Sequence, residues 1–374
     1  MKILFISHNT HQHNYFKQVI DNIKFSAKIV RSPFCFNIFS TKKIIKQLNI
    51  NKILKVKFLE VDIKYTNKIA NKLYKLILKL QTPFIASGYI KEIKKSDANI
   101  IAFWNGKKYP QNIGVAVTKL LNKQTLFFEN GALPNTTAID FYGLNATATI
   151  PKDIKTYKNY TTKAKLNKNL TQRKEEKKRI KDNISLPPNF IFVPFQVGYD
   201  SQLIYHSPWI DTMDELFDII DEISKKLKIY FIFKEHPSDK KSDYSHLHKK
   251  AKNNNFINFA NAIATPKLIQ KCDTIVTINS SVGIEGLLYN KKIITLGEAF
   301  YNIEGLVKHA NNKKELEEIL YNKDNWKIDT QLIEKFLLYL QEEYLIKDSW
   351  KNPTDQHFKQ IIRKLKEYDD KTNL

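Results

Sequence analysis

The sequence predicts an α/β protein with two doubly wound domains of the Rossmann type, and three observations support this prediction. Short apolar runs alternate with loops and amphipathic segments, which is typical of parallel sheets covered by helices. The length of 374 residues suits two domains, each with its own core. A strongly polar stretch at 163–183 stands between two series of such runs, where a connection between domains is expected.

The first series begins with the apolar run at 2–7, which is too short for a signal peptide and indicates a buried strand. Further strands are expected at 99–104 and 124–129, with a helix at 113–121 between them. The segment LYKLILKL at 73–80 has helical periodicity. Its apolar face either packs on the core, which we favour, or lies against a membrane.

The second series restarts after Pro187 and Pro188, and two helices close the chain. Its strands are expected at 190–195, 229–234, 274–279 and 291–296, and its helices at 213–227, 281–289, 329–345 and 353–367. The predicted domains are therefore 1–184 and 185–345, followed by a C-terminal helix within 346–374.

The net charge of +23 suggests an anionic partner, although a Lys-, Asn- and Ile-rich composition is also expected from an A+T-rich genome. No zinc-finger spacing, aromatic RNA-binding motif or helix-turn-helix accompanies the charge, so we expect no nucleic-acid partner. An anionic sugar and the inner face of the cytoplasmic membrane are better candidates. No apolar run approaches the roughly 18–20 residues of a membrane span, so the protein is expected in the cytoplasm.

Polar residues follow the expected strands of the second series, at the sheet edge where open parallel sheets bind ligands. Gln196 and Asp200 follow the first of these strands. Lys234, His236 and Pro237 follow the second, where the proline fixes the direction of the imidazole and the lysine suits a phosphate. A simple turn and a structural histidine are the plainer interpretations of these two groups.

The third group is Asn279, Ser280 and Ser281 at the start of a helix that includes Glu285. Two hydroxyls beside the backbone N–H groups of a helix N-terminus can hold an anion without a metal, whereas an ordinary N-cap needs only one serine. The chain has no Asp-x-Asp pair, which favours a donor with one phosphate over a metal-bound diphosphate.

In the first series, Glu129 ends an expected strand behind two phenylalanines, a setting that suits a general acid. The residues that follow this strand and its neighbour are expected to line a cleft: Trp104, Asn105, Gly106, Asn130 and Gly131. His8, His11 and His13 follow the first strand, but no carboxylate or cysteine accompanies them. We therefore expect a polar loop there and no metal site.

Taken in order, these groups resemble the capsule polysaccharide biosynthesis family, which includes bacterial β-Kdo transferases. The resemblance extends over 100–310 and includes Phe128-Glu129-Asn130-Gly131, Asp140 and the segment LGEAFY at 296–301. It implies a GT-B-like fold with two domains facing a central cleft and C-terminal helices that cross back. It also implies CMP-Kdo as donor, no metal or other cofactor, and retention of configuration.

By the same resemblance, His236, Ser280 and Ser281 would bind the phosphate of CMP, with Gln196 and Lys234 nearby. Glu129 would be the general acid/base, and Asp200 the nucleophile of a double displacement, with Asp140 as second candidate. The acceptor would be a glycolipid or oligosaccharide of capsule or lipopolysaccharide synthesis.

Two alternatives stay open. One is a transferase that uses CMP-sialic acid, another CMP-nonulosonate or a UDP-sugar on the same scaffold. The other is a non-catalytic polysaccharide-binding or export-associated protein.

Overall fold

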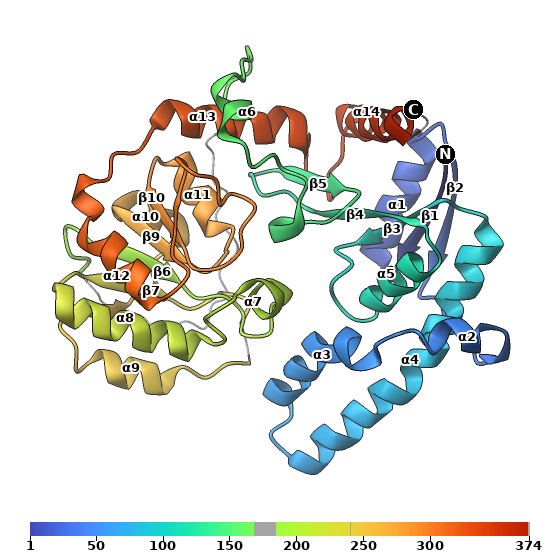
Figure 1. Cartoon of the computed structure of the whole chain (residues 1–374), viewed down its shortest axis with the longest axis horizontal. Helices are drawn as coiled ribbons and strands as arrows, with labels where there is room; N and C mark the ends of the chain where they lie inside the picture. Colours follow the sequence, from blue (N-terminus) through green and yellow to red (C-terminus); the bar gives the residue numbers. More distant parts are fainter. Residues whose placement is uncertain (168–184, 240, 373–374) are drawn as a thin grey trace. The chain divides into compact units, whose positions relative to one another are not determined.

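The computed structural model describes residues 1–167, 185–239 and 241–372. These residues form two compact α/β units, each with its own six-stranded sheet (Figure 1). Unit 1 contains Met1–Thr149 and Tyr344–Leu374, and unit 2 contains Ile150–Glu343. The chain therefore leaves unit 1 once and returns to it near its C-terminus.

The division between the units falls at residue 149, not at the predicted 184. The residues that follow it pack on a late helix of unit 2, because the ring of Tyr157 lies edge-on to those of Phe336 and Tyr339 at 5.1 and 5.3 Å. The C-terminal residues predicted as a separate helix belong to unit 1. Most of the polar stretch at 163–183 lies outside the described residues.

Unit 1 has a mixed sheet in the order β12-β5-β4-β3-β1-β2. The strands from β4 to β2 are parallel, and β5 and β12 add an antiparallel edge. The strands are β1 (Lys2–Ser7), β2 (Ser26–Arg31), β3 (Ile100–Trp104), β4 (Gln124–Asn130), β5 (Thr136–Asp140) and β12 (Leu345–Lys347).

Helices cover both faces of this sheet because successive residues of its strands point to opposite sides. On one face, Ile3 and Phe5 pack with Phe16 and Phe358 in a core that also contains Trp104. The helices of unit 1 are α1 (Thr10–Asn22), α2 (Lys42–Ile45), α3 (Ile50–Lys64), α4 (Lys68–Ser96), α5 (Gln111–Leu120) and α14 (Asp355–Thr372).

The pair α3 and α4 extends away from the sheet (Figure 1). The C-terminal part of α4 packs under the sheet with α5, where Tyr89 contacts Phe103 with 6.3 Å between ring centroids. The N-terminal part of α4 contributes Leu78 to a small core with Leu54 and Val61 of α3, and Tyr74 packs against that core. The preferred prediction, that the face at 73–80 packs on the core, is therefore wrong for Leu73, Leu76, Ile77 and Leu80, which are all exposed.

Unit 2 has a wholly parallel sheet in the order β11-β10-β9-β6-β7-β8. Numbered within the unit, this is the strand order 6-5-4-1-2-3 of a dinucleotide-binding fold. The strands are β6 (Ile191–Pro194), β7 (Phe231–Lys234), β8 (Ile257–Phe259), β9 (Thr274–Thr277), β10 (Lys292–Thr295) and β11 (Lys308–His309).

The main core of unit 2 lies between this sheet and α8, where Phe195, Phe217 and Phe233 pack together. The longer helices of unit 2 with their bounds are α7 (Ser201–His206), α8 (Met213–Leu227), α9 (Ser245–Ala251), α10 (Thr265–Lys271), α11 (Val282–Leu288), α12 (Lys313–Tyr321) and α13 (Thr330–Tyr339). Shorter helical segments of this unit are α6 (Ile154–Lys158), the 3-10 turn Lys323–Asn325 and the π-helical turn Leu340–Tyr344, which ends at the first residue of the returning unit 1 segment.

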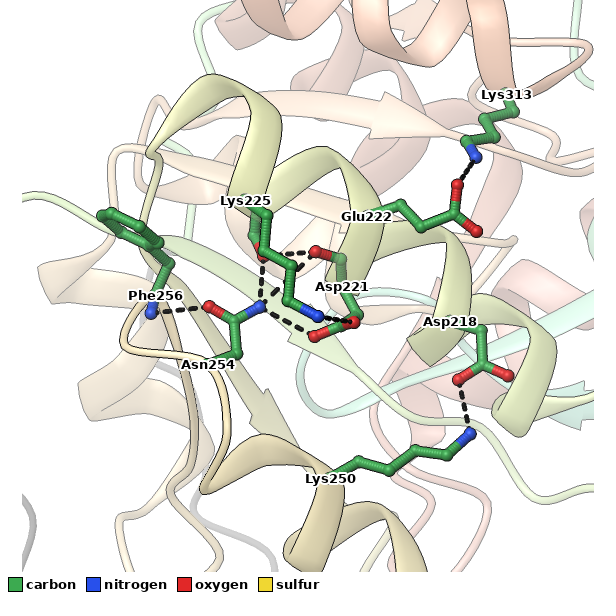
Figure 2. Close-up of polar contacts among 9 residues, drawn as sticks. Asp218, Asp221, Glu222, Lys225, Lys250, Asn254, Phe256 and Lys313 are labelled. Atoms are coloured by element: carbon green, nitrogen blue, oxygen red, sulfur yellow. Dashed lines mark hydrogen bonds and ion pairs between the residues drawn. The ribbon is translucent and has the colours of Figure 1, made fainter.

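Polar contacts attach the outer face of α8 to its neighbours (Figure 2). Asp218 pairs with Lys250 of α9 at 2.9 Å, and Glu222 pairs with Lys313 of α12. The buried Asn254 donates to Asp221 Oδ1 at 2.7 Å and to Ser224 Oγ at 2.8 Å. These contacts tie α8 to its neighbours α9 and α12.

Candidate functional site

The residue pair Gln196 and Asn279 marks the switch point of the unit 2 sheet. These residues follow β6 and β9, the neighbouring strands at which the strand order reverses. Gln196 Nε2 donates to Asn279 Oδ1 at 2.9 Å, and Asn279 N donates to Gln196 Oε1 at 3.1 Å. Because ligands of doubly wound sheets bind beyond the strand ends at this point, the pair identifies the candidate site of unit 2.

Asn279 also ties the switch point to the loop that carries Asp200. Its Nδ2 donates to the carbonyl oxygens of Gln202 and His206 at 3.0 and 3.1 Å. Asp200 is the N-cap of α7, and its Oδ1 accepts from Gln202 N at 2.8 Å. The structure therefore gives Asp200 a fixed, half-buried position beside the pair, in a capping role that is compatible with chemistry at its carboxylate.

The two serines after Asn279 have different roles. Ser280 Oγ accepts from Val282 N at 3.2 Å, so its hydroxyl caps the first turn of α11. Ser281 occupies the N-cap position without a capping side-chain hydrogen bond. The predicted use of both hydroxyls is therefore divided: Ser280 shapes the turn, and Ser281 is the better placed for a ligand. Glu285 lies in the first turn of α11 and is half-buried.

Tyr301 supports this turn from below, a role that was not predicted. It is fully buried, and its hydroxyl donates to the Ser280 carbonyl at 2.5 Å. A Cβ at Gly283 would lie 2.4 Å from the same hydroxyl oxygen, so only glycine fits above it. Burial raises the pKa of Tyr301, which keeps the hydroxyl protonated as a donor. Tyr301 belongs to the LGEAFY segment, but sequence spacing alone cannot show that it lies under Gly283.

His236 and Pro237 form a turn directly after β7. Asp239 N donates to the His236 carbonyl at 3.0 Å, which places Pro237 at the second position of the turn, where its fixed φ is favourable. Ser238 N donates to His236 Nδ1 at 3.1 Å. In the neutral ring the proton then lies on Nε2, so this nitrogen is the donor that a phosphate oxygen could use.

Lys234 is placed differently from the prediction. It is 3% exposed, and its ammonium donates to the carbonyl oxygens of Asn261 and Ile263 at 2.7 and 2.6 Å. Lys234 is the last residue of β7. Because successive side chains of a strand point to opposite faces, that of Lys234 lies on one face of the sheet and does not extend beyond the strand end. It therefore holds the loop after β8 and does not present its charge beside His236.

In unit 1, Glu129 is held by two asparagines. Its Oε2 accepts from Asn105 Nδ2 at 2.5 Å, and its Oε1 accepts from the backbone N and the Nδ2 of Asn130, both at 3.0 Å. Asn130 Oδ1 in turn accepts from Trp350 Nε1 at 2.8 Å. The structure thus brings Asn105, Glu129 and Asn130 together as predicted, and it adds Trp350 from the C-terminal segment.

The two glycines predicted at this edge shape its loops. Gly106 has φ +75°, a conformation that favours glycine, and a Cβ there would lie 2.5 Å from the ring of Phe127. A Cβ at Gly131 would lie 1.9 Å from Thr136 Oγ1. Both glycines therefore permit close packing behind Glu129.

Trp104 does not line a cleft. It is 7% exposed and packs on Tyr15 and on Trp350, with 4.5 Å between the two indole centroids. Its position in β3 directs it into the core beneath α1, on the same side as Ile100 and Ala102. The sequence predicted correctly that Trp104 ends a strand, but it did not show toward which face of the sheet the side chain points.

Asp140 has a structural environment that leaves its second-candidate role without support. Its Oδ1 accepts from Tyr142 N and Gly143 N at 2.8 and 3.1 Å. Its Oδ2 accepts from Thr149 N, Thr149 Oγ1 and Tyr344 Oη at 2.7, 2.8 and 3.0 Å. With five donors on a buried carboxylate, Asp140 anchors the loop at 141–149, and we assign it a structural role.

His8 lies at the switch point of the unit 1 sheet, after β1 and beside β3. Its Nε2 lies 2.7 Å from Tyr89 Oη, and burial lowers its pKa to about 4, so the ring is neutral at physiological pH. His11 is exposed, and His13 Nδ1 lies 3.0 Å from Ser7 Oγ. In the described part of the chain, no group of three or more His, Cys, Asp or Glu side chains is arranged to hold a metal ion.

A groove of about 420 Å³ lies between α1 and the segment at Trp350 in unit 1. Tyr15 and Trp350 supply its aromatic surface, and the other lining side chains are polar. The groove is lined by His11, Asn14, Tyr15, Gln18, Trp350 and Lys351. Aromatic faces beside amides and cations are chemically suited to sugar rings with acidic groups.

The sequence of the chain is similar to those of known proteins. The model of the family described as "Capsule polysaccharide biosynthesis protein" matches residues 119–349. Protein FixF of Sinorhizobium fredii is 34% identical over 297 residues, which are 77% of this chain and 71% of FixF. The capsule polysaccharide export protein KpsS of Escherichia coli is 28% identical over 162 residues, which are 41% of this chain and 40% of KpsS.

Among solved structures, the chain is similar to KpsC of Thermosulfurimonas dismutans, described as a beta Kdo 2,7 transferase. The TM-score is 0.51 at 14% identity, with 99% of this chain and 100% of that chain covered. The likeness supports the predicted α/β, GT-B-like fold, in which both units are doubly wound. The family that the sequence motifs suggested is confirmed, and this chain belongs to the capsule polysaccharide biosynthesis protein family.

Proposed function

We propose that this chain is a glycosyltransferase that moves Kdo from CMP-Kdo to a glycolipid or oligosaccharide acceptor of capsule or lipopolysaccharide synthesis. The observation that carries the proposal is the Gln196–Asn279 pair at the switch point of unit 2, flanked by the His236–Pro237 turn and by Ser281. Membership of the capsule polysaccharide family and the fold likeness to a Kdo transferase support the choice of sugar.

In this proposal the CMP phosphate binds between His236 and the start of α11. His236 Nε2–H donates to one phosphate oxygen, and Ser281 Oγ–H donates to another. Neither contact needs a metal, because the leaving phosphate is a monoester whose charge these donors offset. Lys234 is not part of this set, since its ammonium is buried against two carbonyls.

The proposed chemistry is a double displacement. Asp200 attacks the anomeric carbon of Kdo, and the bond from that carbon to the phosphate oxygen breaks with its electron pair leaving on CMP. Glu129 then takes the proton of the acceptor hydroxyl, whose oxygen attacks the same carbon and releases the Asp200 carboxylate. Two inversions give net retention. The hydrogen bond from Gln202 N to one Asp200 oxygen orients the nucleophile, and Asn105 and Asn130 orient Glu129.

The direct test is the intact mass of the protein after incubation with CMP-Kdo. In Glu129→Gln the adduct should accumulate, giving a mass increase of one Kdo residue, and this increase should be absent in Glu129→Gln combined with Asp200→Asn. Asn can still cap α7 through its Oδ1, so the second substitution should preserve the fold. Asp211→Asn, an exposed carboxylate of unit 2, is the matched control.

The same samples separate the alternatives. Release of CMP from CMP-sialic acid but not from CMP-Kdo would reassign the donor, and release of UDP would reassign its nucleotide. Binding of polysaccharide without turnover of any donor would reject the enzyme in favour of a binding or export role.

A second test concerns the nucleotide contacts. His236→Gln can place an amide N–H near the Nε2 position, whereas His236→Asn can replace only Nδ1. We expect His236→Gln to retain more CMP affinity than His236→Asn in calorimetric titrations. Equal loss in both variants would show that Nε2–H does not contact the nucleotide.

We also propose that transfer takes place at the inner face of the cytoplasmic membrane. Within the described residues, no helix has the length and apolarity needed to span a bilayer.

A further inference from the structure

Helix α4 exposes a continuous row of aliphatic side chains. The exposed fractions are 79% for Ile69, 57% for Leu73, 51% for Leu76, 45% for Ile77 and 62% for Leu80. The spacing i, i+4, i+7, i+8 and i+11 puts all five on one side of the helix. An apolar row of this size is unusual on the surface of a soluble monomer and indicates an interaction site.

Aromatic side chains extend this row at its C-terminal end. Phe84, one turn beyond Leu80, lies 6.1 Å from the rings of both Phe34 and Phe36. Phe34 is 48% exposed and Phe36 80%. We call these eight residues the apolar stripe; its helical part, 69–84, is about 22 Å long at 1.5 Å per residue.

Positive charge accompanies the apolar stripe. Lys68, Lys72 and Lys79 are exposed, and their spacing on α4 places them along one flank of the stripe. The whole segment 22–91 contains only two acidic residues, Glu60 and Asp62. Glu60 pairs with Lys57 at 2.9 Å, and Asp62 pairs with Lys75 at 2.5 Å. Negative charge is therefore scarce in this region, and what exists is neutralised within α3 and α4.

We propose that the apolar stripe and its lysines form a docking face for an anionic phospholipid bilayer. Apolar side chains beside lysines on one face of a helix are the composition of helices that lie in the headgroup region. The aliphatic groups would enter the boundary of the acyl chains, and the lysine ammonium groups would contact lipid phosphates. Helices α3 and α4 project from the sheet of unit 1 (Figure 1), and the aliphatic side chains of the stripe on α4 are exposed.

Charge also argues against a second copy of this chain as the occupant. Two such faces would bring their lysines together without intervening carboxylates, and like charges at an interface oppose association. An anionic lipid surface has the complementary charge and tolerates an irregular apolar row, because lipids rearrange around it.

The docking face would be the surface by which the proposed transferase attaches to the cytoplasmic membrane. The inference rests on the proposed function for its biological meaning, but not for its evidence. Its test uses no donor sugar. Failure of docking would leave the transferase proposal intact, and failure of transfer would leave docking intact.

The test is flotation of the full chain with vesicles of phosphatidylcholine, alone or mixed with phosphatidylglycerol. Wild-type protein should float with the mixed vesicles and much less with the neutral ones. Each lysine near an anionic surface contributes roughly a factor of five to binding, so Lys68→Gln/Lys72→Gln/Lys79→Gln should lower it on the order of 100-fold. Lys252→Gln/Lys267→Gln/Lys271→Gln removes the same charge from exposed positions of unit 2 and should bind like wild type.

A second variant tests the apolar contribution. Leu73→Asn/Leu76→Asn/Leu80→Asn should reduce binding to mixed vesicles by roughly 1,000-fold or more, because each methylene withdrawn from the interface costs roughly a factor of four and each leucine withdraws at least two. Tyr321→Asn, at a residue 76% exposed in unit 2, is its control. Because the leucines are exposed, only the lower helix propensity of asparagine should reduce the unfolding midpoint of this variant, and circular dichroism should show that it stays folded.

Three results would overturn the proposal: no flotation of wild type, equal flotation of the stripe and control variants, or equal binding to neutral and anionic vesicles. A dimer in solution that the leucine variant dissociates would assign the face to a second copy instead.

Discussion

Gln196 and Asn279 hold each other in a single orientation at the switch point of unit 2. Asn279 Nδ2 donates to two backbone carbonyls, which turns its Oδ1 toward Gln196 at 2.9 Å. Gln196 must then present its NH₂ group to that oxygen and its own Oε1 to Asn279 N at 3.1 Å. The network thus determines both amide orientations and joins β6, β9 and α7 at the point where the donor is proposed to bind.

Gln196→Glu should destabilise unit 2 by roughly 1–3 kcal/mol at pH 7, because a carboxylate would face Asn279 Oδ1 with no proton to donate. The effect should shrink toward pH 4, where the protonated carboxyl can donate again. Urea unfolding followed at both pH values would measure it. Gln270→Glu, at an exposed position of the same unit, is the control, and a loss that does not depend on pH would contradict the explanation.

Trp350→Phe tests the contact between the C-terminal segment and Glu129. Phenylalanine keeps an aromatic ring against Trp104 but removes the donor to Asn130 Oδ1. Asn130 would then hold Glu129 less firmly, and we expect glycosyl transfer to fall about tenfold, the effect of one hydrogen bond. CMP affinity should not change, since the nucleotide is proposed to bind unit 2.

Initial rates of transfer beside CMP titrations would separate these two effects of Trp350→Phe. Trp326→Phe in unit 2 provides a matched control. Unchanged rates would show that Asn130 needs no support from the indole.

His8 should make unit 1 less stable as the pH falls. Burial lowers its pKa from 6.5 to about 4, so between these values the unfolded chain binds the proton that the folded chain excludes. The stabilisation present above pH 6.5 is lost as the pH falls toward 4, by an amount on the order of 3 kcal/mol. Denaturant unfolding of unit 1 at a series of pH values measures this loss. The free energy of unfolding should depend less steeply on pH in His8→Gln than in the wild type.

His11→Gln, at an exposed histidine of the same helix region, should keep the wild-type pH dependence. If both variants behaved like wild type, His8 would not carry the linkage, and the other histidines of unit 1 would have to be tested.

Asn254→Ala should lower the free energy of unfolding of unit 2 by about 2 kcal/mol, since it removes a buried amide with partners on both of its polar atoms. Its Nδ2 donates to Asp221 and Ser224, and its Oδ1 accepts from Phe256 N at 2.9 Å (Figure 2). Asn255→Ala, one residue away and exposed, should change stability by less than about 0.5 kcal/mol. Calorimetry of both variants would decide it, and similar losses would point to the turn itself.

Most interior strands could be predicted from the sequence, and the four edge strands could not. Runs such as Phe190–Phe195 are apolar throughout because both faces of a central parallel strand are buried. An edge strand needs only one buried face and can be very short. The strands that escaped prediction are the edge strands β2, β8, β11 and β12 and the interior antiparallel strand β5.

The position of a residue at the end of a strand predicted its place in the candidate site better than its residue type did. Gln196 and Asn279 were expected at strand ends and lie there together. Lys234 was predicted to contact a phosphate because of its charge. Its side chain lies on a buried face of the sheet, where it donates to two backbone carbonyls. The prediction that Trp104 lines a cleft was wrong for the same reason, because the face of β3 on which it lies is covered by the core. The face at 73–80 shows a third limit: periodicity reveals an apolar face, but not what covers it.

The return of the chain to unit 1 also sets an order of events during synthesis. Residues 150–343 are made, and their sheet can form, before the segment that supplies Leu345–Lys347 and Tyr344 exists. Until then β5 has no strand on its outer edge, and Asp140 lacks the donor from Tyr344. A nascent chain paused before residue 344 would present a bare β-edge, which is where a chaperone or an aggregating neighbour would add a strand. Completion of the last thirty or so residues is therefore the step that closes the domain made first.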